Sequence, residues 1–241
     1  MSGPSKKWKD TMNEAIRDTA WDAYDDIIKK EVTFYNSKFS AKPALPNVNW
    51  LILKAMLWNE SGGPTNPQWK KRTMQIGNKG DPALKVLTGG KEGSHLIAAP
   101  ELISKLRAGK VNDPEINIRA GLAYLYTRMA TFDHASIRDP KDTKVHEYKV
   151  VGGDSLSKIA KKVGTTVAEL KAMNPKAEKM IRPGDILEFH KASIEMVVTG
   201  WRTFDTKTIA KRYNGGGDPN YEAKLNHLLS DVIPKLDAKR R

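Results

Sequence analysis

Residues 148–189 read YKVVGGDSLSKIAKKVGTTVAELKAMNPKAEKMIRPGDILEF, and this stretch has the spacing of a complete small domain. A run of β-branched and aromatic residues at 148–151 predicts a strand, and the run at 186–189 predicts a second one. Between them, apolar residues recur at helical spacing after polar caps, the first of which is Asp154 or Ser155. The stretch therefore predicts a strand–helix–helix–strand unit.

This unit interrupts a longer helical pattern that resumes after it. Its two ends would emerge close together, as an inserted domain requires. We therefore expect an inserted domain at 144–192, a main domain built from 47–143 and 193–241, and a helical arm at 1–46.

The other segments predict helices, so the expected fold class is α+β and mainly α. An apolar stripe with acidic residues opposite predicts a helix at 11–32, and a dense apolar run predicts one at 49–60 that Gly62-Gly63-Pro64 ends. Asn117 is expected to cap a buried helix. The further expectations are helices at 82–88, 100–107, 118–129, 194–213 and 219–236, with a polar linker at 133–144.

Composition excludes several kinds of chemistry. The chain of 241 residues has no cysteine, which excludes disulfides, Cys-ligated zinc and a thiol nucleophile. Its five histidines lack metal-ligand spacing, so neither a metal nor a cofactor is expected. No apolar run approaches the roughly 18 residues that span a bilayer, so integral membrane association is not expected. The net charge of +13 favours a polyanion, but no nucleic-acid motif accompanies it, so nucleic acid is not an expected partner.

Glu60 is the candidate catalytic residue. It stands at the end of the apolar helix, where burial and the partial negative charge of the helix C-terminus both favour a protonated carboxyl group. Its pKa should therefore rise toward neutrality, as a general acid requires. The alternative is an ordinary helix-terminal glutamate in solvent.

The quoted stretch resembles the LysM module over nearly its whole length, through YKVVGGDSLSKIAKKVGTTVAEL, MNP and IRPGDIL. That family binds chains containing N-acetylglucosamine in a shallow groove between the first strand–helix turn and the loop after the second helix. The resemblance places seven residues beside the sugar: Gly152, Gly153, Asp154, Ser155, Asn174, Pro175 and Ile181. Glycine turns would admit an acetamide group and Ile181 would offer an apolar wall, although such residues also simply shape turns.

The outer segments resemble the soluble lytic transglycosylases, and goose-type lysozymes are similar. Four motifs carry this resemblance in the family's order: ESGG at 60–63, MQI at 74–76, NIRAG at 117–121 and YNG at 213–215. It implies a lysozyme-like domain in which Glu60 is the acid and base. Tyr213, the second catalytic residue that the resemblance implies, would lie near this glutamate. A Met-Gln strand would line the sugar cleft, and Asn117 would be structural. The implied substrate-binding residues are Ser61, Met74, Gln75 and Asn214. Arg72-Thr73 and Gly216 depart from the family pattern, which leaves the detail of the cleft open.

The number of carboxylates bears on the reaction type. A hydrolase with one acid needs a second carboxylate, and none lies between Glu60 and Met74, although Asp81 and Glu92 follow later and stay candidates. With one carboxylate, the acetamido group and the 6-hydroxyl of N-acetylmuramic acid would complete the reaction and give a 1,6-anhydro product. We predict a lytic transglycosylase that acts on the bond from N-acetylmuramic acid to N-acetylglucosamine. A hydrolytic muramidase and a non-catalytic peptidoglycan-binding protein are the alternatives.

The expected substrate also bears on location. The first ten residues are polar and lysine-rich, unlike a secretory signal, so we expect synthesis in the cytoplasm without a signal peptide. Action in the periplasm or cell wall would then need a secretion system or cell lysis, as for an antibacterial effector or a phage lysin. The expected partner is the glycan strand of peptidoglycan, with an immunity protein and a secretion-system component as further candidates.

Overall fold

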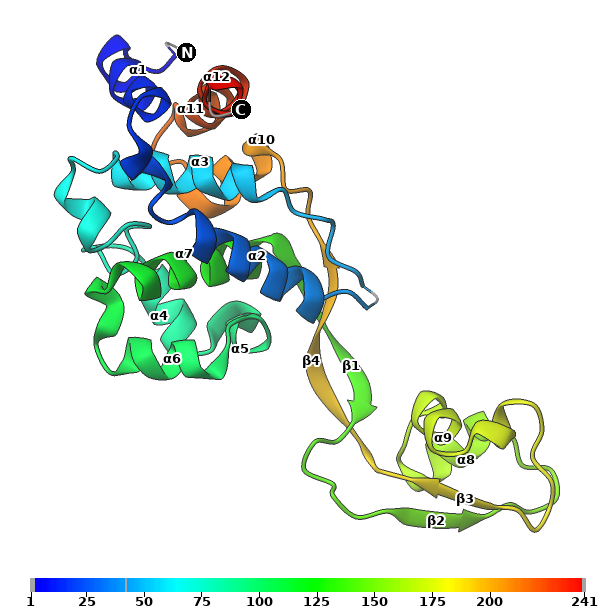
Figure 1. Cartoon of the computed structure of the whole chain (residues 1–241). Helices are drawn as coiled ribbons and strands as arrows, with labels where there is room; N and C mark the ends of the chain where they lie inside the picture. Colours follow the sequence, from blue (N-terminus) through cyan, green and yellow to red (C-terminus); the bar gives the residue numbers. More distant parts are fainter. Residues whose placement is uncertain (1–2, 42, 240–241) are drawn as a thin grey trace. The chain divides into compact units, whose positions relative to one another are not determined.

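The computed structural model describes residues 3–41 and 43–239, and the chain divides into two compact units (Figure 1). Unit 1 comprises residues 1–132 and 198–241, and unit 2 comprises residues 133–197. Unit 2 contains the predicted insert at 144–192 and extends beyond both of its predicted ends.

The regular structure of unit 1 is helical, apart from the start of β1 (Ala130–Arg138) and the end of β4 (Ala192–Trp201). Its helices are α1 (Lys6–Asn13), α2 (Asp25–Lys38), α3 (Trp50–Ser61), α4 (Ala83–Thr88), α5 (Ser94–Ile97), α6 (Pro100–Arg107), α7 (Pro114–Met129), α10 (Thr206–Ile209), α11 (Tyr221–His227) and α12 (Ile233–Lys239). A π-helical turn at Ala210–Asn214 follows α10, and another at Leu228–Val232 joins α11 to α12. The mainly helical character agrees with the predicted fold class.

The central helix α3 confirms the prediction for 49–60. The Asn49 side chain accepts a hydrogen bond from the Leu51 backbone N–H and so caps the first turn. Every residue from Ile52 to Trp58 is buried, which accounts for the dense apolar run. The helix ends at Gly62, whose φ of 73° is the left-handed conformation that glycine adopts without a steric penalty.

The prediction of one helix at 11–32 is wrong. The segment contains α1, two short 3₁₀ turns and α2. Asp18 has an extended backbone, and its carboxylate accepts a hydrogen bond from the Ala20 N–H, which begins a new turn and ends the helical register. The apolar stripe is nevertheless buried, since Met12 and Ile28 are each only 1% exposed.

The start of α7 also differs from the expectation, because Asn117 is not its cap. The helix begins at Pro114, and Asp113 caps it by accepting a hydrogen bond from the Ile116 N–H. Proline suits the first helical position because that position needs no N–H donor. Asn117 is left inside the first turns and is fully buried.

Two further expectations need correction. The polar linker at 133–144 and the start of the helix at 194–213 are largely strands, β1 (Ala130–Arg138) and β4 (Ala192–Trp201), which pair with each other. Pairing satisfies the backbone groups of both strands, and the β-branched residues of β4 suit an extended chain. Helix begins again only at α10, where Asp205 provides the cap.

Unit 2 confirms the strand–helix–helix–strand prediction. Its elements are β2 (His146–Lys149), α8 (Leu156–Val163), α9 (Val167–Met173) and β3 (Ile186–Phe189). β2 and β3 are antiparallel, with Tyr148 opposite Leu187. Ser155 and Thr166 cap the two helices. Its small core consists of Val150, Ile159, Ala160, Leu170, Ala177, Leu187 and Phe189.

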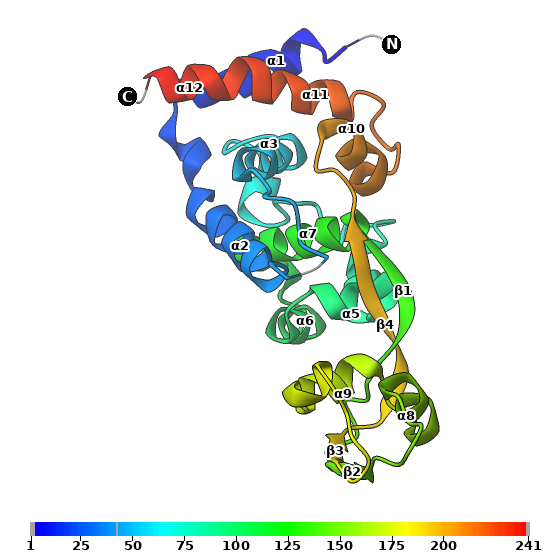
Figure 2. The ribbon, with the colours of Figure 1, turned by 90° about the vertical axis from the view of Figure 1, so that its right-hand side faces the viewer.

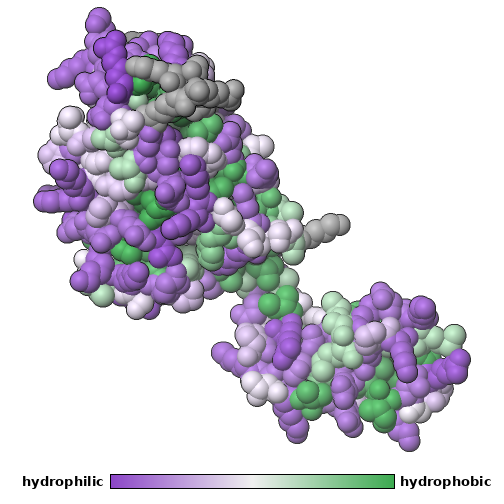
Figure 3. Space-filling view, viewed as in Figure 1, coloured by the Kyte–Doolittle hydropathy of each residue, from purple (hydrophilic) through white to green (hydrophobic). Residues whose placement is uncertain are grey.

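The N-terminal and C-terminal helices lie side by side within unit 1 (Figure 2). α1 lies beside the helix formed by α11 and α12 in two perpendicular views (Figures 1 and 2). Figure 3 shows hydrophilic side chains over most of the viewed face of unit 1, with apolar ones in separate small areas. Among the described residues, no helix is both long enough and apolar enough to span a membrane.

Candidate functional site

A cavity of about 260 Å³ in unit 1 contains the predicted catalytic glutamate. Glu60 reaches it from the end of α3, Tyr124 from α7, and Tyr213 with Asn214 from the π-helical turn. The loop before α4 supplies the other wall. The full lining is Glu60, Met74, Gln75, Ile76, Asn78, Lys79, Asp81, Tyr124, Tyr213 and Asn214. The fold thus gathers Glu60, Met74, Gln75, Tyr213 and Asn214 as the sequence predicts.

The Glu60 carboxyl group is poised to carry a proton near neutral pH. Burial raises its pKa from 4.5 to about 7, and the negative charges of Asp218 and Asp81 act in the same direction. The Tyr221 hydroxyl donates a hydrogen bond of 2.6 Å to Glu60 Oε1, which favours the ionised form and limits the rise. The expectation from sequence that burial shifts this pKa upward is confirmed.

Residues 74–76 form a turn, so the expected Met-Gln strand is wrong. Asn117 holds this turn from within α7. Its side-chain oxygen accepts from the Met74 N–H at 2.9 Å, and its amide nitrogen donates to the Ile76 carbonyl at 3.0 Å and to the Val111 carbonyl at 2.8 Å. Because these backbone groups are bonded to a side chain instead of a neighbouring strand, the segment folds as a turn and Asn117 has the structural role expected for it.

Met74 and Tyr213 fix the floor of the cavity. The Tyr213 hydroxyl donates to the Met74 carbonyl at 3.1 Å, and its ring lies edge-on to Tyr124 at 5.8 Å. A Cβ atom on Gly121 would lie 2.5 Å from the Met74 side chain, so the glycine permits α7 to approach the turn closely. Tyr213 therefore supports the cavity and makes no hydrogen bond to Glu60 among the described contacts.

Gln75 joins the turn to α3, the helix that carries Glu60. Its side-chain nitrogen donates to the Glu60 backbone carbonyl at 2.6 Å, a group that the end of α3 leaves without a helical partner. Gln75 itself is exposed and has a φ of 58°, which is unusual for a residue with a side chain. A strained, exposed residue beside the candidate acid is consistent with a role in substrate contact.

Of the two other predicted substrate-binding residues, Asn214 lines the cavity and Ser61 does not. Ser61 is fully buried, and its hydroxyl donates to the Leu57 carbonyl and accepts from the Gly63 N–H. It does not line the cavity, so its predicted role in substrate binding is corrected to a role in stabilising the helix end. Asn214 does line the cavity and donates to the Asp218 carbonyl at 3.3 Å.

The N-terminal segment packs against α3, the helix that carries Glu60. The Trp58 indole N–H donates to the Trp21 carbonyl at 3.0 Å, and the two rings meet edge-on at 5.2 Å. Trp21 also lies against Gly63, where an added Cβ would come within 2.3 Å of its ring. Lys54, 2% exposed, pairs with Asp22 and Asp25 at 2.7 Å each. The predicted arm is therefore packed on the helix that carries Glu60.

Sequence analysis missed two residues at this site, Tyr221 and Tyr124, and kept a third, Asp81, as an open candidate. Tyr221 begins α11 and is 2% exposed, yet no motif linked it to Glu60. Tyr124 was counted only as part of an apolar helix. Asp81 was left open, and it lines the cavity while its two oxygens accept from the Gly77 and Ala83 N–H groups. Aspartate followed by proline before a short helix is a turn signal that places a carboxylate at this point.

Glu92, the other carboxylate that the sequence left open, has a different role. It is hydrogen-bonded to Arg128 and does not line the cavity. Within the described part of the chain, no group of three or more His, Cys, Asp or Glu residues could hold a metal ion. The polar groups that line the cavity are carboxyl, phenol and amide groups and the ammonium group of Lys79.

The first predicted glycan loop of unit 2 is open to solvent. No atom lies within 4 Å of a Cβ added to Gly152 or Gly153. Asp154 shapes the turn, because one oxygen accepts from the Tyr148 hydroxyl and the Val151 N–H, and these bonds lower its pKa. Ser155 caps α8. A ligand at Gly152 and Gly153 would thus contact backbone atoms of the loop.

The second predicted loop borders a cavity of about 350 Å³ in unit 2. Asn174 and Pro175 line it, although the Asn174 amide is bonded to the Leu170 carbonyl and to both backbone groups of Glu188. Met180 and Ile186, 61% and 52% exposed, add apolar surface that sequence analysis did not select. Ile181 packs against the small core and is not part of this lining.

Comparison with known proteins identifies one family. Residues 148–188 match the LysM domain. Comparison with curated proteins and with solved structures gives no match. The match suggests that unit 2 binds peptidoglycan or a related glycan, and it leaves the function of unit 1 to its own chemistry.

Proposed function

We propose that this protein is a lytic transglycosylase of peptidoglycan, in which unit 2 binds the glycan strand and Glu60 cleaves it. The observation that carries the proposal is the cavity around Glu60. Because the pKa of Glu60 is about 7, its carboxyl group can donate a proton in one step and accept one in the next. The LysM match supports the same polymer as substrate. The order of the four motifs in the outer segments supports the reaction class.

The first step needs a proton on Glu60. The carboxyl group donates it to the oxygen that links N-acetylmuramic acid to N-acetylglucosamine, the bond from C1 to that oxygen breaks, and the leaving sugar takes the proton as a hydroxyl. The acetamido oxygen of the muramic acid stabilises the positive charge at C1. Tyr221, bonded to Glu60 Oε1, favours the carboxylate that this step leaves.

The second step regenerates the acid. The 6-hydroxyl of the same sugar attacks C1 and transfers its proton to the Glu60 carboxylate, which forms the 1,6-anhydro ring without water. The attack is intramolecular and gains from proximity. Gln75 and Tyr213 keep the acid and the cavity floor in place through the Glu60 and Met74 carbonyls.

Mass spectrometry of digested sacculi tests the proposal. The full chain should release muropeptides with anhydro ends, which are one water lighter than hydrated ends. Glu60→Gln should reduce release at least about a thousandfold while glycan binding persists, because the substitution removes only the transferable proton. Glu115→Gln, at an exposed carboxylate outside the cavity, is the matched control. Wall cleavage by Glu60→Gln would contradict the assignment of Glu60.

A hydrolytic muramidase is the second candidate, and Asp81 favours it. A second carboxylate in the same cavity is what a hydrolase needs to position water. Two backbone N–H groups already occupy Asp81, which argues for a role in shaping the loop. Hydrated product ends that disappear in Asp81→Asn would establish hydrolysis instead.

A further inference from the structure

A second and larger cavity of unit 1, about 550 Å³, has a different chemistry from the one around Glu60. Its lining contains only cationic and amide side chains: Gln68, Lys70, Lys71, Arg72, Asn78 and Asn112. The cationic residues follow one another in the segment that leads from Trp69 to the Met74 turn. The cavity therefore combines positive charge with hydrogen-bond donors.

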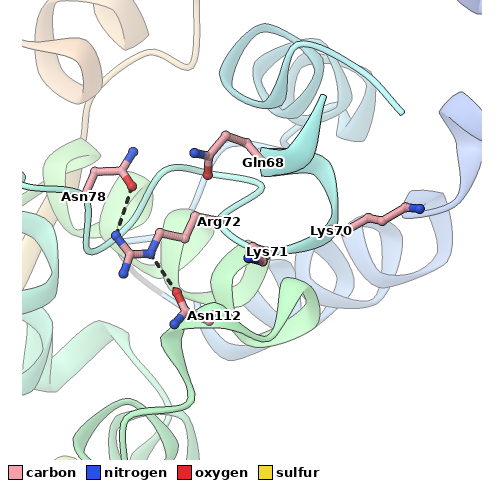
Figure 4. Close-up of a pocket in the computed structure, with 6 residues that line it drawn as sticks. All are labelled: Gln68, Lys70, Lys71, Arg72, Asn78 and Asn112. Carbon is pink, nitrogen blue, oxygen red and sulfur yellow. Dashed lines mark hydrogen bonds between the residues drawn. The ribbon is translucent and has the colours of Figure 1, made fainter. Parts of the chain in front are cut away.

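Arg72 is fixed at the centre of this cavity (Figure 4). Its Nε donates to Asn112 Oδ1 at 2.7 Å, and one terminal nitrogen donates to the Gly77 carbonyl at 2.7 Å and to Asn78 Oδ1 at 3.2 Å. The other terminal nitrogen has no hydrogen bond among the described contacts. Figure 4 also shows Gln68 beside this cluster and Lys70 directed away from Arg72.

Among the described residues, no carboxylate pairs with the positive charges of the cavity. In the described chain, neither Lys70, Lys71 nor Arg72 forms a salt bridge, although other cations of unit 1, such as Lys54 and Arg119, do. All bonds of the Arg72 guanidinium are to neutral oxygens. A concave surface that keeps an ordered guanidinium and free lysines favours an anion, and carboxylates match this geometry.

The cavity shares one lining residue with the Glu60 site. Asn78 lines both cavities, and it is bonded to Arg72 on one side and to Gln75 on the other. A ligand seated beside Glu60 could thus extend past Asn78 toward Arg72. In peptidoglycan, the group that branches from the glycan at each muramic acid is a peptide stem that carries free carboxylates.

We propose that the Arg72 cavity is a subsite for the carboxylates of the peptide stem, so that the preferred substrate is a glycan strand that still bears its peptides. The proposal rests on the proposed function of the Glu60 site. It adds a specificity for stem peptides that the glycan-binding unit does not supply.

Titration calorimetry with a synthetic stem tetrapeptide tests the subsite without requiring turnover. The full chain should bind the peptide, and Lys71→Glu should weaken binding about tenfold at low salt, because it reverses a charge beside the anion. Lys105→Glu makes the same charge change at an exposed lysine of α6 outside the cavity and should leave binding unchanged. The tetrapeptide with amidated carboxyl groups should bind at least about tenfold more weakly.

Three results with the tetrapeptide would overturn the subsite. They are absence of peptide binding, equal binding of the amidated peptide, and equal losses in the two lysine variants. If a short single-stranded DNA binds in place of the peptide and Lys71→Glu weakens it, the cavity is a phosphate site and the proposal is wrong.

Turnover separates this proposal from the proposed function. The full chain should cleave intact sacculi faster than glycan strands stripped of peptide, and Lys71→Glu should reduce this preference while cleavage of stripped strands persists. Cleavage of both substrates at equal rates would refute the subsite and leave the catalytic proposal standing. If the peptide binds with the expected variant effects but neither substrate is cleaved, the catalytic proposal is refuted and the subsite stands.

Discussion

Gly63 and Gly121, near the Glu60 cavity, touch buried side chains, whereas Gly152 and Gly153 of the predicted glycan loop in unit 2 border open space. A Cβ on Gly63 or Gly121 would lie 2.3 or 2.5 Å from a neighbouring side chain. On Gly152 or Gly153 it would meet nothing within 4 Å. Close packing thus holds the proposed catalytic site in one arrangement, while unit 2 keeps room for a ligand at its surface.

The asparagines of the two units show the same difference. Asn117 and Asn174 each bond three backbone groups and so tie distant segments together. Asn117 is fully buried, and water cannot replace its bonds. Asn174 is partly exposed and next to a cavity, so water can. The asparagine of unit 1 therefore acts in a buried place, whereas the asparagine of unit 2 acts at a turn that water can reach.

The largest expected effect comes from Gly63→Ala. Gly63 has a φ of 91° and faces the buried Trp21, so a methyl group would strain the backbone and displace the ring. We expect unit 1 to lose about 3 kcal/mol of unfolding free energy. Differential scanning calorimetry would measure it, and hydrogen exchange would localise the change.

Gly152→Ala is the matched substitution in unit 2. It enters open space at a residue without positive φ, so its effect should stay within about 0.5 kcal/mol. Equal losses in the two variants would mean that glycine is not used differently in the two units.

Asn117→Ala should lower the unfolding free energy by a similar amount. The Met74 N–H and the Ile76 and Val111 carbonyls would lose their partners in a buried place, at a cost of about 3 kcal/mol. Asn174→Ala should cost about 1 kcal/mol, because its partners are accessible to water. Urea denaturation of each variant would give the two values, and a larger loss for Asn174→Ala would reverse the comparison.

The pH dependence should also separate the units. Glu60 acts as an acid only when protonated, so cleavage should fall about tenfold per pH unit above a pKa of about 7. None of the predicted glycan contacts in unit 2 ionises between pH 7 and 9, so glycan binding by Glu60→Gln should be constant there. Cleavage rates and sedimentation with sacculi at matched pH values would measure both. Cleavage that rises from pH 7 to 9 would exclude Glu60 as the acid.

The same pKa has a consequence for stability. Because the folded-state pKa of Glu60 lies above its usual 4.5, the protonated form contributes stability that is complete below pH 4.5 and is lost as the pH rises through about 7. Glu60→Gln, which stays neutral, should therefore melt at a higher temperature than the natural chain at pH 8.5. A lower melting temperature would show that the carboxylate is not destabilised by burial.

The smallest expected effect is that of Tyr221→Phe. The hydroxyl favours the ionised form of Glu60, so its loss should raise the pKa of Glu60 and move the alkaline limb of the pH profile upward by less than about one unit. A pH–rate profile would measure the shift. A fall in rate at every pH without a shift of the limb would mean that Tyr221 supports the fold alone.

Unit 2 and α3 could be predicted because their signals are local. Caps, turn residues and apolar spacing lie within a few residues of one another, as at Ser155 in α8 and at Asn49 and Gly62 in α3. Local signals failed where pairing partners are far apart: β1 and β4 were expected to be a linker and a helix, because only their mutual pairing favours the extended form.

The sequence by itself determined the LysM resemblance of unit 2, helix α3 and the upward shift of the Glu60 pKa. Only the tertiary structure brought Tyr221 to Glu60, across 161 positions of sequence, and Asp81 into the same cavity. The reason is physical: helix period and capping act over neighbouring residues, but a buried carboxyl group takes its partners from whichever segments the core packs against it.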